Sequence, residues 1–206
     1  MARDTQSIVK MSRREGYALH PKAHKALVKR TSMPGQGASG GRFRGKASQY
    51  SMQLREKQKV RRLYGLLEKQ FSNLMKEASR TKGQSGEVLL QLLEQRADNV
   101  VYRAGLAPSR RAARQLVTHG HFMLNGKRFD IPSLRIKPGD ELVVRDQSKK
   151  TEYFKNIDDV SPAGESMVSW LATDRSKLHI KVKALPNRDE AEPDINEQLI
   201  VEYYSR

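Results

Sequence analysis

The sequence contains no cysteine, which excludes disulfide bonds, thiolate catalysis and cysteine-ligated metal sites. Aromatic residues make up only 6%, and no apolar run is long enough to cross a membrane. The N-terminus lacks the apolar core of a secretory signal. With 37% hydrophobic residues and a mean hydropathy of -0.74, the 206 residues can bury only small cores. We therefore expect a cytoplasmic protein of one or two modest domains.

Acidic residues are also scarce. There are 39 Lys+Arg against 23 Asp+Glu, a net charge of +16. Residues 1–80 carry 19 basic and 5 acidic residues, whereas 151–206 carry 7 and 11. A chain this basic favours a nucleic-acid partner, and its acidic C-terminal part should face protein. A membrane-surface protein is the competing interpretation, but it needs an amphipathic or lipid anchor that the sequence does not show.

The residue patterns of common enzymes are missing. There is no glycine-rich phosphate loop followed by Lys-Ser/Thr and no nucleophile elbow, and the predicted folding pattern leaves Asp98, Asp130 and Asp140 isolated. His20 and His24 are spaced i, i+4, but two histidines without further ligands make a poor metal site. We predict no catalytic residue, no metal, no cofactor and no small-molecule substrate.

The first half of the chain predicts an arm followed by helices. Residues 1–49 show no sustained periodicity and are expected to order against RNA or the rest of the protein, or to form a tail without a role. From residue 50 an apolar stripe predicts helices to 78 with a break at Gly65. The opposite face of this segment either follows phosphates or is merely solvated. The basic residues of this face include Lys69 and Lys76, and its candidate RNA-binding residues are Arg55, Lys57, Lys59, Arg61 and Arg62.

The most informative stretch begins after a second apolar stripe, which runs from Val88 to Val101 and is ended by Gly105. Ser109 is suited to cap a helix over 110–119 that Gly120 terminates. Three apolar residues of this helix should face inward, which leaves its arginines pointing outward. Arginine binds phosphate through two parallel hydrogen bonds and stacks on bases. The candidate RNA-binding residues here are Ser109, Arg110, Arg111 and Arg114.

A small antiparallel sheet should follow this helix. Asn125-Gly126 predicts a hairpin between strands at 122–124 and 127–129. Lys137-Pro138-Gly139-Asp140 predicts another turn, between strands at 134–136 and 141–144. Further candidate RNA contacts are His119, His121, Lys127 and Arg128, although histidines are more commonly satisfied or solvated.

These patterns predict an α+β protein with a mostly helical N-terminal domain and an inserted RNA-binding module of paired helices and a small antiparallel sheet. The arm spans 1–49, the helical domain spans 50–93 and is completed by 180–206, and the module spans 94–150. Residues 151–179 are an extension of the module or a linker, in which Trp170 should anchor packing. Helix-turn-helix DNA binding stays an alternative, although a helix with a small sheet is not that motif.

Three segments carry a family resemblance. They are SRREG at 12–16, YSMQLREKQKVRRLYGLLEKQF at 50–71 and DINEQLIVEYYSR at 194–206, and between them GEVLLQLLEQRADNVVYRAGLAPSRRAARQLVTHGHFMLNGKR resembles an RNA-binding module. The whole chain resembles the bacterial family of small-subunit ribosomal protein four. The module also occurs in pseudouridine synthases, synthetases and heat-shock proteins, so an RNA-modifying or tRNA-handling factor is the alternative. Such a factor needs a further domain for which we expect the chain to have no room.

The resemblance implies a primary binder of 16S-type rRNA that grips a helix junction in the 5′ domain, nucleates assembly of the small subunit and turns over no substrate. It places the chain in a bacterial or plastid ribosome and adds Arg13 and Arg14 to the RNA-binding candidates. Arg42, Arg44 and Lys46 match a basic stretch near the tunnel through which mRNA passes inward. Four residues resemble the surface that meets ribosomal protein five and influences decoding accuracy, or they belong to the domain core: Tyr50, Gln53, Leu199 and Ile200.

One departure from the family concerns metal. Some members hold zinc with N-terminal cysteines, and this chain has none. The resemblance therefore does not change the prediction that the chain binds no zinc.

Overall fold

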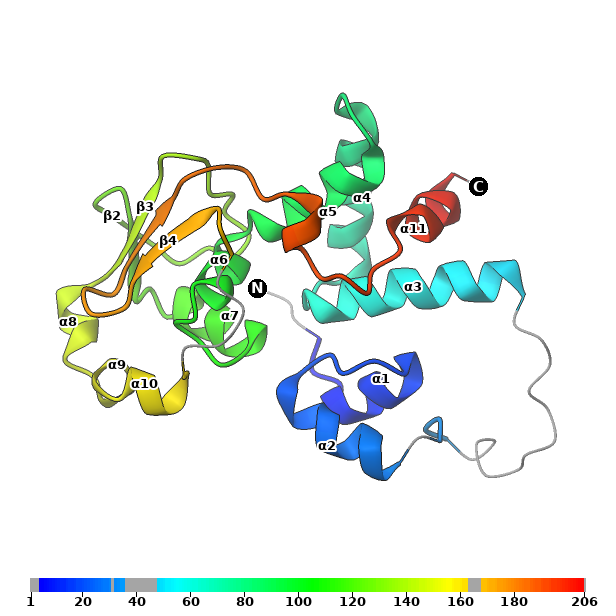
Figure 1. Cartoon of the computed structure of the whole chain (residues 1–206), viewed down its shortest axis with the longest axis horizontal. Coiled ribbons are helices and arrows are strands. Elements are labelled where there is room, and N and C mark those ends of the chain that lie inside the picture. Colours follow the sequence, from blue (N-terminus) through cyan, green and yellow to red (C-terminus); the bar gives the residue numbers. More distant parts are fainter. Residues whose placement is uncertain (1–3, 31, 36–47, 163–167, 206) are drawn as a thin grey trace. The chain divides into compact units, whose positions relative to one another are not determined.

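The computed structural model describes residues 4–30, 32–35, 48–162 and 168–205 (Figure 1). The chain divides into two compact units, one made of residues 1–89 and 194–206 and the other of residues 90–193. The basic residues matched to the mRNA path lie outside the described residues: Arg42, Arg44 and Lys46.

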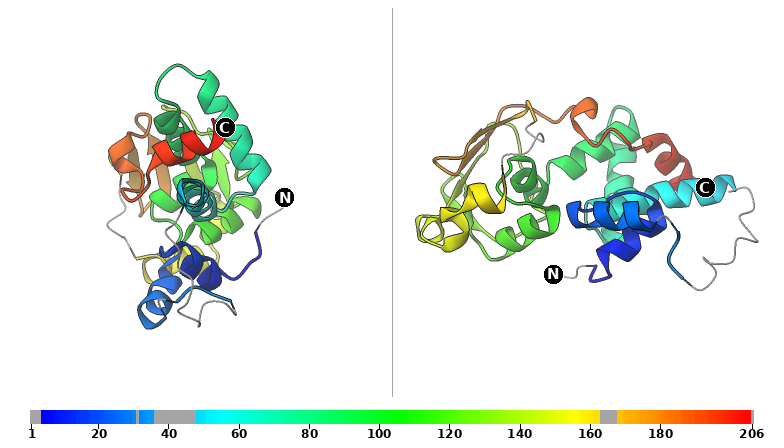
Figure 2. Two further views of the ribbon diagram at one scale, coloured as in Figure 1. Left: turned by 90° about the vertical axis from the view of Figure 1, so that its right-hand side faces the viewer. Right: turned by 60° about the horizontal axis from the view of Figure 1, so that its bottom comes forward.

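The first unit is helical. Its elements are α1 (Ile8–Glu15), α2 (Pro21–Lys29), α3 (Gln49–Leu63), α4 (Glu68–Arg80), the first half of α5 (Ser85–Glu94) and α11 (Glu197–Tyr204). Val60, Phe71 and Ile200 have no exposed surface, and the ring of Phe71 on α4 lies 6.3 Å from that of Tyr204 on the C-terminal α11. Helix α11 packs across α3, which the left view of Figure 2 shows end-on. The last residues of the chain therefore complete the unit formed by the first.

Helices α1 and α2 were not expected, because residues 1–49 show no sustained periodicity. The two helices pack together and bury Met11 and Ala23, and α1 also packs against α3. This part of the arm therefore orders against the rest of the protein, which was one of the expected outcomes. Local signals explain their ends. Gly16 takes the left-handed conformation after α1 (φ 65°), and Pro21 opens α2 at a position where a missing N–H does no harm. Helices of eight and nine residues are too short to show a clear period in the sequence.

The predicted break at Gly65 is confirmed. This residue lies between α3 and α4 with φ 65°, and its N–H donates to the carbonyl of Arg62 at 3.1 Å. A left-handed residue there turns the chain back, so the two helices share one core instead of forming a single long helix.

The second unit combines helices with a five-stranded antiparallel sheet of order β2-β1-β3-β5-β4. Its strands are β1 (Phe122–Leu124), β2 (Lys127–Phe129), β3 (Glu141–Val144), β4 (Leu171–Asp174) and β5 (His179–Val182). Its helices beyond α5 are α6 (Ala97–Arg103), α7 (Arg110–Thr118), α8 (Asp146–Lys149), α9 (Glu152–Lys155), α10 (Ile157–Val160) and the 3-10 turn η2 (Arg188–Glu190). The expected α+β class, a helical domain followed by a module with a small antiparallel sheet, is confirmed.

The paired helices and the hairpin follow the predicted pattern. Ser109 caps α7 by accepting a hydrogen bond from the N–H of Ala112 at 3.3 Å, and Gly120 follows the helix with φ 69°. Asn125 and Gly126 both have positive φ in the hairpin turn. Helices α6 and α7 pack together, and Trp170 belongs to the same core with 2% of its surface exposed. The prediction that Trp170 anchors packing is confirmed.

The predicted strand at 134–136 is wrong. This segment makes only an isolated bridge between Arg135 and Arg96, because its backbone is bonded to the link between α5 and α6. The N–H of Ala97 donates to the carbonyl of Leu134 at 2.8 Å, and the N–H of Ile136 donates to the carbonyl of Gln95 at 2.9 Å. The same contacts divide the long apolar stripe into α5 and α6.

The sheet also moves the expected C-terminal boundary. Residues from 180 onward were expected to complete the helical domain, but β5 pairs with β3, and Ile180 lies opposite Leu142. Of the residues from 180 onward, only 194–206 belong to the first unit. Residues 171–182 extend the module with β4 and β5, because the apolar side chains of these strands are needed to cover the core beside β3.

Candidate nucleic-acid interface

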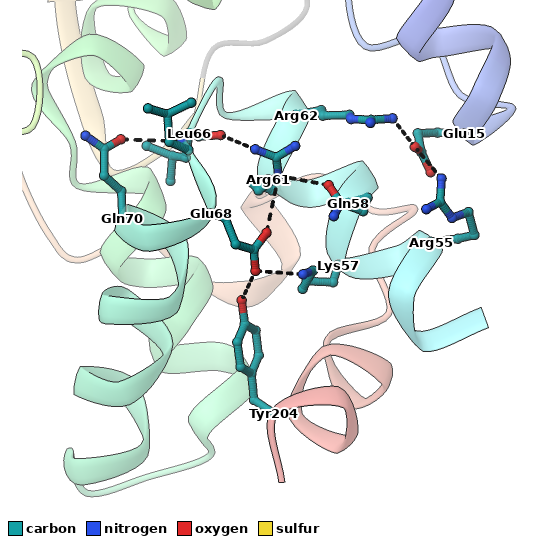
Figure 3. A network of polar contacts seen from close by, with 11 residues as sticks. Glu15, Arg55, Lys57, Gln58, Arg61, Arg62, Leu66, Glu68, Gln70 and Tyr204 are labelled. Carbon is teal, nitrogen blue, oxygen red and sulfur yellow. Dashed lines mark hydrogen bonds and ion pairs between the residues drawn. The ribbon is translucent and has the colours of Figure 1, made fainter. Parts of the chain in front are cut away.

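The basic face of α3 is held by carboxylates of the same unit (Figure 3). Lys57 is buried, and its Nζ lies 2.6 Å from the Glu68 carboxylate and 4.4 Å from the centre of the Tyr203 ring. The hydroxyl of Tyr204 donates to the same carboxylate at 2.9 Å. Glu68 thus joins α3 and α11 through one side chain.

Three arginines of α3 have internal partners as well. Arg61 donates to the Gln58 side chain at 2.9 Å and to the Leu66 carbonyl at 3.1 Å. Arg55 and Arg62 both contact the carboxylate of Glu15, whose side chain is fully buried (Figure 3). Arg55 alone keeps a substantial exposed surface, 36% of its side chain. The acidic end of α1 is thereby fixed on α3.

The protonation properties of these carboxylates follow from their surroundings. Burial raises the pKa of Glu15, and the nearby Arg55 and Arg62 offset that effect only in part. Burial also acts to raise the pKa of Glu68, but hydrogen bonds from Lys57 and Tyr204 outweigh it, and the pKa of Glu68 is lowered. Glu68 therefore remains ionised and keeps its ion pair at neutral pH.

Among the other basic candidates of the first unit, some bond to the protein and one is exposed. The Nζ of Lys59 lies 2.8 Å from Glu56 and donates to the carbonyl of Asp194 at 2.6 Å. Arg13 donates to the carbonyl of Ser32 through two nitrogens, at 3.1 and 2.9 Å. Arg14 is exposed. The alternative of a merely solvated face is wrong for Lys57, Lys59, Arg61 and Arg62, since their ammonium and guanidinium groups bond to the protein.

In the second unit, two of the three arginines on α7 do not point outward as predicted. Arg110 donates through Nε to the Asn99 side chain at 2.8 Å and through an Nη to Glu192 at 2.8 Å. Its guanidinium also lies 4.6 Å from the centre of the Tyr102 ring. An Nη of Arg114 lies 3.5 Å from the carboxylate of Asp98. The side chains of Arg110 and Arg114 are only 12% and 13% exposed.

Glu94 stands at the centre of this network with 1% of its surface exposed. Its carboxylate accepts two hydrogen bonds from Arg103, at 2.9 and 2.8 Å, and one from Asn99 at 2.6 Å. Asn99 passes the connection on to Arg110. Buried charges are tolerated when each is paired and hydrogen-bonded, so this network fixes α6 against α7.

Asp98 forms the second part of the network. The expectation that Asp98 is isolated is wrong, because it is 5% exposed and accepts hydrogen bonds from Arg96 at 3.1 and 2.8 Å. Asp140 is not isolated either: it accepts from the Asn125 side chain and from the N–H of Lys137, both at 2.8 Å. Both acids hold turns and helix ends in place.

The exposed face of α7 carries Arg111, Gln115 and Thr118, spaced i, i+4 and i+7, and leads to the exposed His119. Lys127 and Arg128 are exposed on the hairpin. The guanidinium of Arg128 lies over Gly120, where an added Cβ would be 2.7 Å from its Nε. Arg145 donates to the carbonyl of Gly120 at 3.2 Å. The end of α7 and the hairpin therefore share one basic surface.

His121 lies deeper than His119. Its Nδ1 is 3.0 Å from the Ser148 hydroxyl, and its ring packs 5.7 Å from that of Phe154. Burial lowers the pKa of His121 below its ordinary value of 6.5, and the nearby His119 and Arg145 lower it further. A neutral imidazole with an internal partner is suited to packing more than to phosphate contact.

The lowered pKa of His121 predicts a stability effect. Below about pH 6.5, the ordinary value, the unfolded chain binds a proton that the folded state binds less readily, so stability should decrease as pH falls through this range. We expect His121→Gln to reduce this decrease in the free energy of unfolding when urea unfolding is measured from pH 7 to 5. His24→Gln, a change at an exposed histidine of the other unit, should leave the pH dependence of stability as in the wild type. The same pH dependence in His121→Gln would show that His121 does not cause the decrease.

The four residues matched to a protein interface differ in burial. Tyr50 is 49% exposed, with its ring 5.8 Å from that of Tyr203, and Leu199 is half-buried. Gln53 is 2% exposed and donates to Glu202 at 2.7 Å, and Ile200 is fully buried. The alternative of domain core thus holds for Gln53 and Ile200, whereas Tyr50 and Leu199 present surface to solvent.

Sequence reasoning missed the carboxylates that hold the arginines: Glu15, Glu68, Glu94, Asp98 and Glu192. Two of them left a signal. Glu94 and Asp98 interrupt an apolar stripe, and a charge at such a position needs a partner of opposite sign. Glu192 lies far along the chain from Arg103 and Arg110, and no local pattern identifies it.

Comparisons with known proteins agree with this geometry. A family model described as the ribosomal protein S4/S9 N-terminal domain matches residues 3–94, and one described as the S4 domain matches residues 95–142. The small ribosomal subunit protein uS4 of Herpetosiphon aurantiacus is 49% identical over 100% of both chains. The chain belongs to the uS4 family. The uS4 proteins of Chlorobaculum tepidum and Chloroflexus aurantiacus are 46% and 48% identical, again over the full length of each chain.

The described part of this uS4 chain has neither a membrane-spanning helix nor a cluster of potential metal ligands. Within the described ranges, no helix has the length and hydropathy needed to span a bilayer. No group of three or more potential metal ligands occurs among the residues that the structure describes.

Proposed function

We propose that this chain is a structural component of the small ribosomal subunit that binds rRNA and catalyses no reaction. The observation that carries the proposal is full-length similarity to uS4 proteins together with an S4 domain whose α7 and hairpin present exposed cations. Phosphate contacts need guanidinium or ammonium groups that solvent can reach, and this surface offers them.

In the second unit we assign RNA contact to Arg111, His119, Lys127 and Arg128. Arg111 begins the exposed face of α7, and Arg128 lies over its end, so an RNA strand that follows this face meets a cation at each end. Ser109, Arg110 and Arg114 act from behind this surface, by capping the helix and fixing it to α6. His121 supports the end of the helix through Ser148.

In the first unit we assign RNA contact to Arg14 and to the exposed part of Arg55. The other basic residues of α3 hold the unit together, and Arg13 binds the backbone at Ser32. The family resemblance places the RNA target at a helix junction of the 5′ domain. On that basis the protein nucleates assembly of the subunit body.

Two further partners follow from the same resemblance. Tyr50 and Leu199 present surface for ribosomal protein five, with Gln53 and Ile200 supporting them from inside, and this contact influences decoding accuracy. The resemblance assigns contact with incoming mRNA to the basic stretch of Arg42, Arg44 and Lys46. Both assignments depend on the resemblance.

The proposal is tested by competition. Full-length protein is bound to a labelled 5′-domain fragment of small-subunit rRNA and challenged with tRNA and with duplex DNA over a range of salt concentrations. We expect rRNA binding to persist at salt concentrations that abolish binding to both competitors, since nonspecific charge pairing falls steeply with salt. Equal competition by all three contradicts the proposal, and preference for tRNA favours a tRNA-handling factor instead.

Gly120 provides a second test of the RNA surface. Gly120→Ala and Gly126→Ala both place a side chain at positive φ, and each should lower stability by about 1–2 kcal/mol. Only at Gly120 would the new Cβ meet the Arg128 guanidinium, because nothing lies within 4 Å of the site at Gly126. We expect Gly120→Ala to weaken rRNA binding several-fold relative to Gly126→Ala in a filter-binding assay. Equal affinities for the two variants would show that Arg128 does not act from this position.

A further inference from the structure

The carboxylate of Glu192 lies where the sequence alone predicts an RNA phosphate, beside the guanidinium of Arg110. This carboxylate lies 2.8 Å from an Nη of Arg110 and 3.4 Å from an Nη of Arg103, so one acidic group bridges two guanidiniums. Arg110 is the first residue of α7, where exposed arginines were expected to bind RNA. The structure instead provides the anion from within the same unit.

The two guanidiniums are fixed by other groups as well. Arg103 is bound through two nitrogens to Glu94, and Arg110 is held by Asn99 and by the ring of Tyr102. These contacts do not involve Glu192. A pair of guanidiniums in fixed positions suits a phosphate as well as it suits a carboxylate, because both anions accept parallel N–H bonds.

The carboxylate is presented by an ordered segment and is within reach of solvent. Ala191 is 5% exposed, and the carboxylate of Glu190 accepts from the N–H of Ser169 at 2.7 Å. The Glu192 side chain itself keeps 18% of its surface exposed. An ordered carboxylate, that of Glu192, therefore occupies the position between Arg103 and Arg110, and solvent can still reach this position.

We propose that Glu192 is a specificity-determining residue that occupies this guanidinium pair and keeps RNA phosphate out of it. The inference rests on the proposed function, since it concerns the same RNA-binding unit. A phosphate contact carries no sequence information, so an open guanidinium pair would give a contact of its own to RNA that does not fit the surface of Arg111, Lys127 and Arg128. By closing the position, Glu192 leaves RNA to the surface of Arg111, Lys127 and Arg128 and lowers the affinity for RNA of the wrong shape.

The test is Glu192→Gln in the full chain, which removes the charge and retains the size of the side chain. Binding to tRNA and to the 5′-domain rRNA fragment is measured against salt. We expect the tRNA affinity of the variant to rise about tenfold, because the tRNA gains one phosphate contact with charge-assisted hydrogen bonds. The dependence of log K on log salt should steepen by about 0.7–0.9, the effect of one more neutralised phosphate. An unchanged slope with unchanged or weaker tRNA binding overturns the inference.

A matched control separates this effect from the loss of a negative charge in general. Asp189→Asn removes one exposed carboxylate three residues earlier and should leave the slope as in the wild type. If Glu192→Gln is unfolded at the assay temperature, Glu192→Asp is measured instead. It draws the carboxylate back by one methylene and should steepen the slope by a smaller amount, whereas a wild-type slope overturns the inference. Wild-type protein that fails to prefer rRNA contradicts the proposed function itself, which is a distinguishable result.

Discussion

Replacing Glu94 with alanine should lower the free energy of unfolding of the second unit by about 3–5 kcal/mol. The carboxylate accepts hydrogen bonds from Arg103 and Asn99 in an environment where only 1% of its residue is exposed. Its removal leaves a guanidinium charge and an amide without their principal acceptor, and the connection through Asn99 to Arg110 is lost as well. Few other single changes in the described part of the chain disturb as many buried polar groups.

Urea unfolding followed by tryptophan fluorescence measures this loss directly. Trp170 is the single tryptophan and lies in the core of the second unit, so its emission reports this unit alone. Glu152→Ala, at an exposed glutamate of α9, serves as the matched control and should change stability by less than about 0.5 kcal/mol. A loss below about 1 kcal/mol for Glu94→Ala would show that the ion network contributes little.

The second large effect concerns RNA binding. Replacing Arg111, Lys127 and Arg128 together with glutamine should reduce the slope of log K against log salt by about 2–3, which is about 0.7–0.9 for each lost phosphate contact. Affinity for the rRNA fragment should fall by at least a hundredfold near physiological salt. The unfolding transition should stay close to that of the wild type, because all three side chains are exposed.

The control for this triple variant removes the same charge elsewhere in the unit. Lys155, Lys177 and Lys183 are exposed and lie outside α7 and the hairpin, and their replacement with glutamine should change the slope much less. Binding is measured by filter retention at several salt concentrations. If the two triple variants lose affinity equally, net charge and not the proposed surface accounts for binding.

Local signals in the sequence were sufficient for much of the fold. Ser109, Gly120 and Asn125-Gly126 act through the conformation of a few neighbouring residues, and the helix and hairpin that they delimit were predicted correctly. The break at Gly65 is of the same kind. The strands β4 and β5 were missed because their pairing with the module depends on residues far apart in the chain.

The candidate site was predicted less well for a related reason. An arginine on the polar face of a helix has the same pattern in the sequence whether it faces solvent or a carboxylate from another segment. Arg110 and Arg111 are neighbours with similar expectations, yet Glu192 binds the first while the second is exposed. The partners Glu15 and Glu192 are brought to these arginines by the tertiary structure, and the periodicity of a helix does not indicate which distant residue will contact it.

Specific binding of small-subunit rRNA by the exposed surface of α7 and the hairpin can be tested by hydroxyl-radical footprinting of full-length small-subunit rRNA. The wild-type protein is compared with the variant at Arg111, Lys127 and Arg128. We expect the wild type to protect one set of helices in the 5′ domain, and we expect this protection to be lost in a variant that Trp170 fluorescence shows to be folded. Protection scattered over the whole rRNA, or protection that the variant retains, would contradict this expectation.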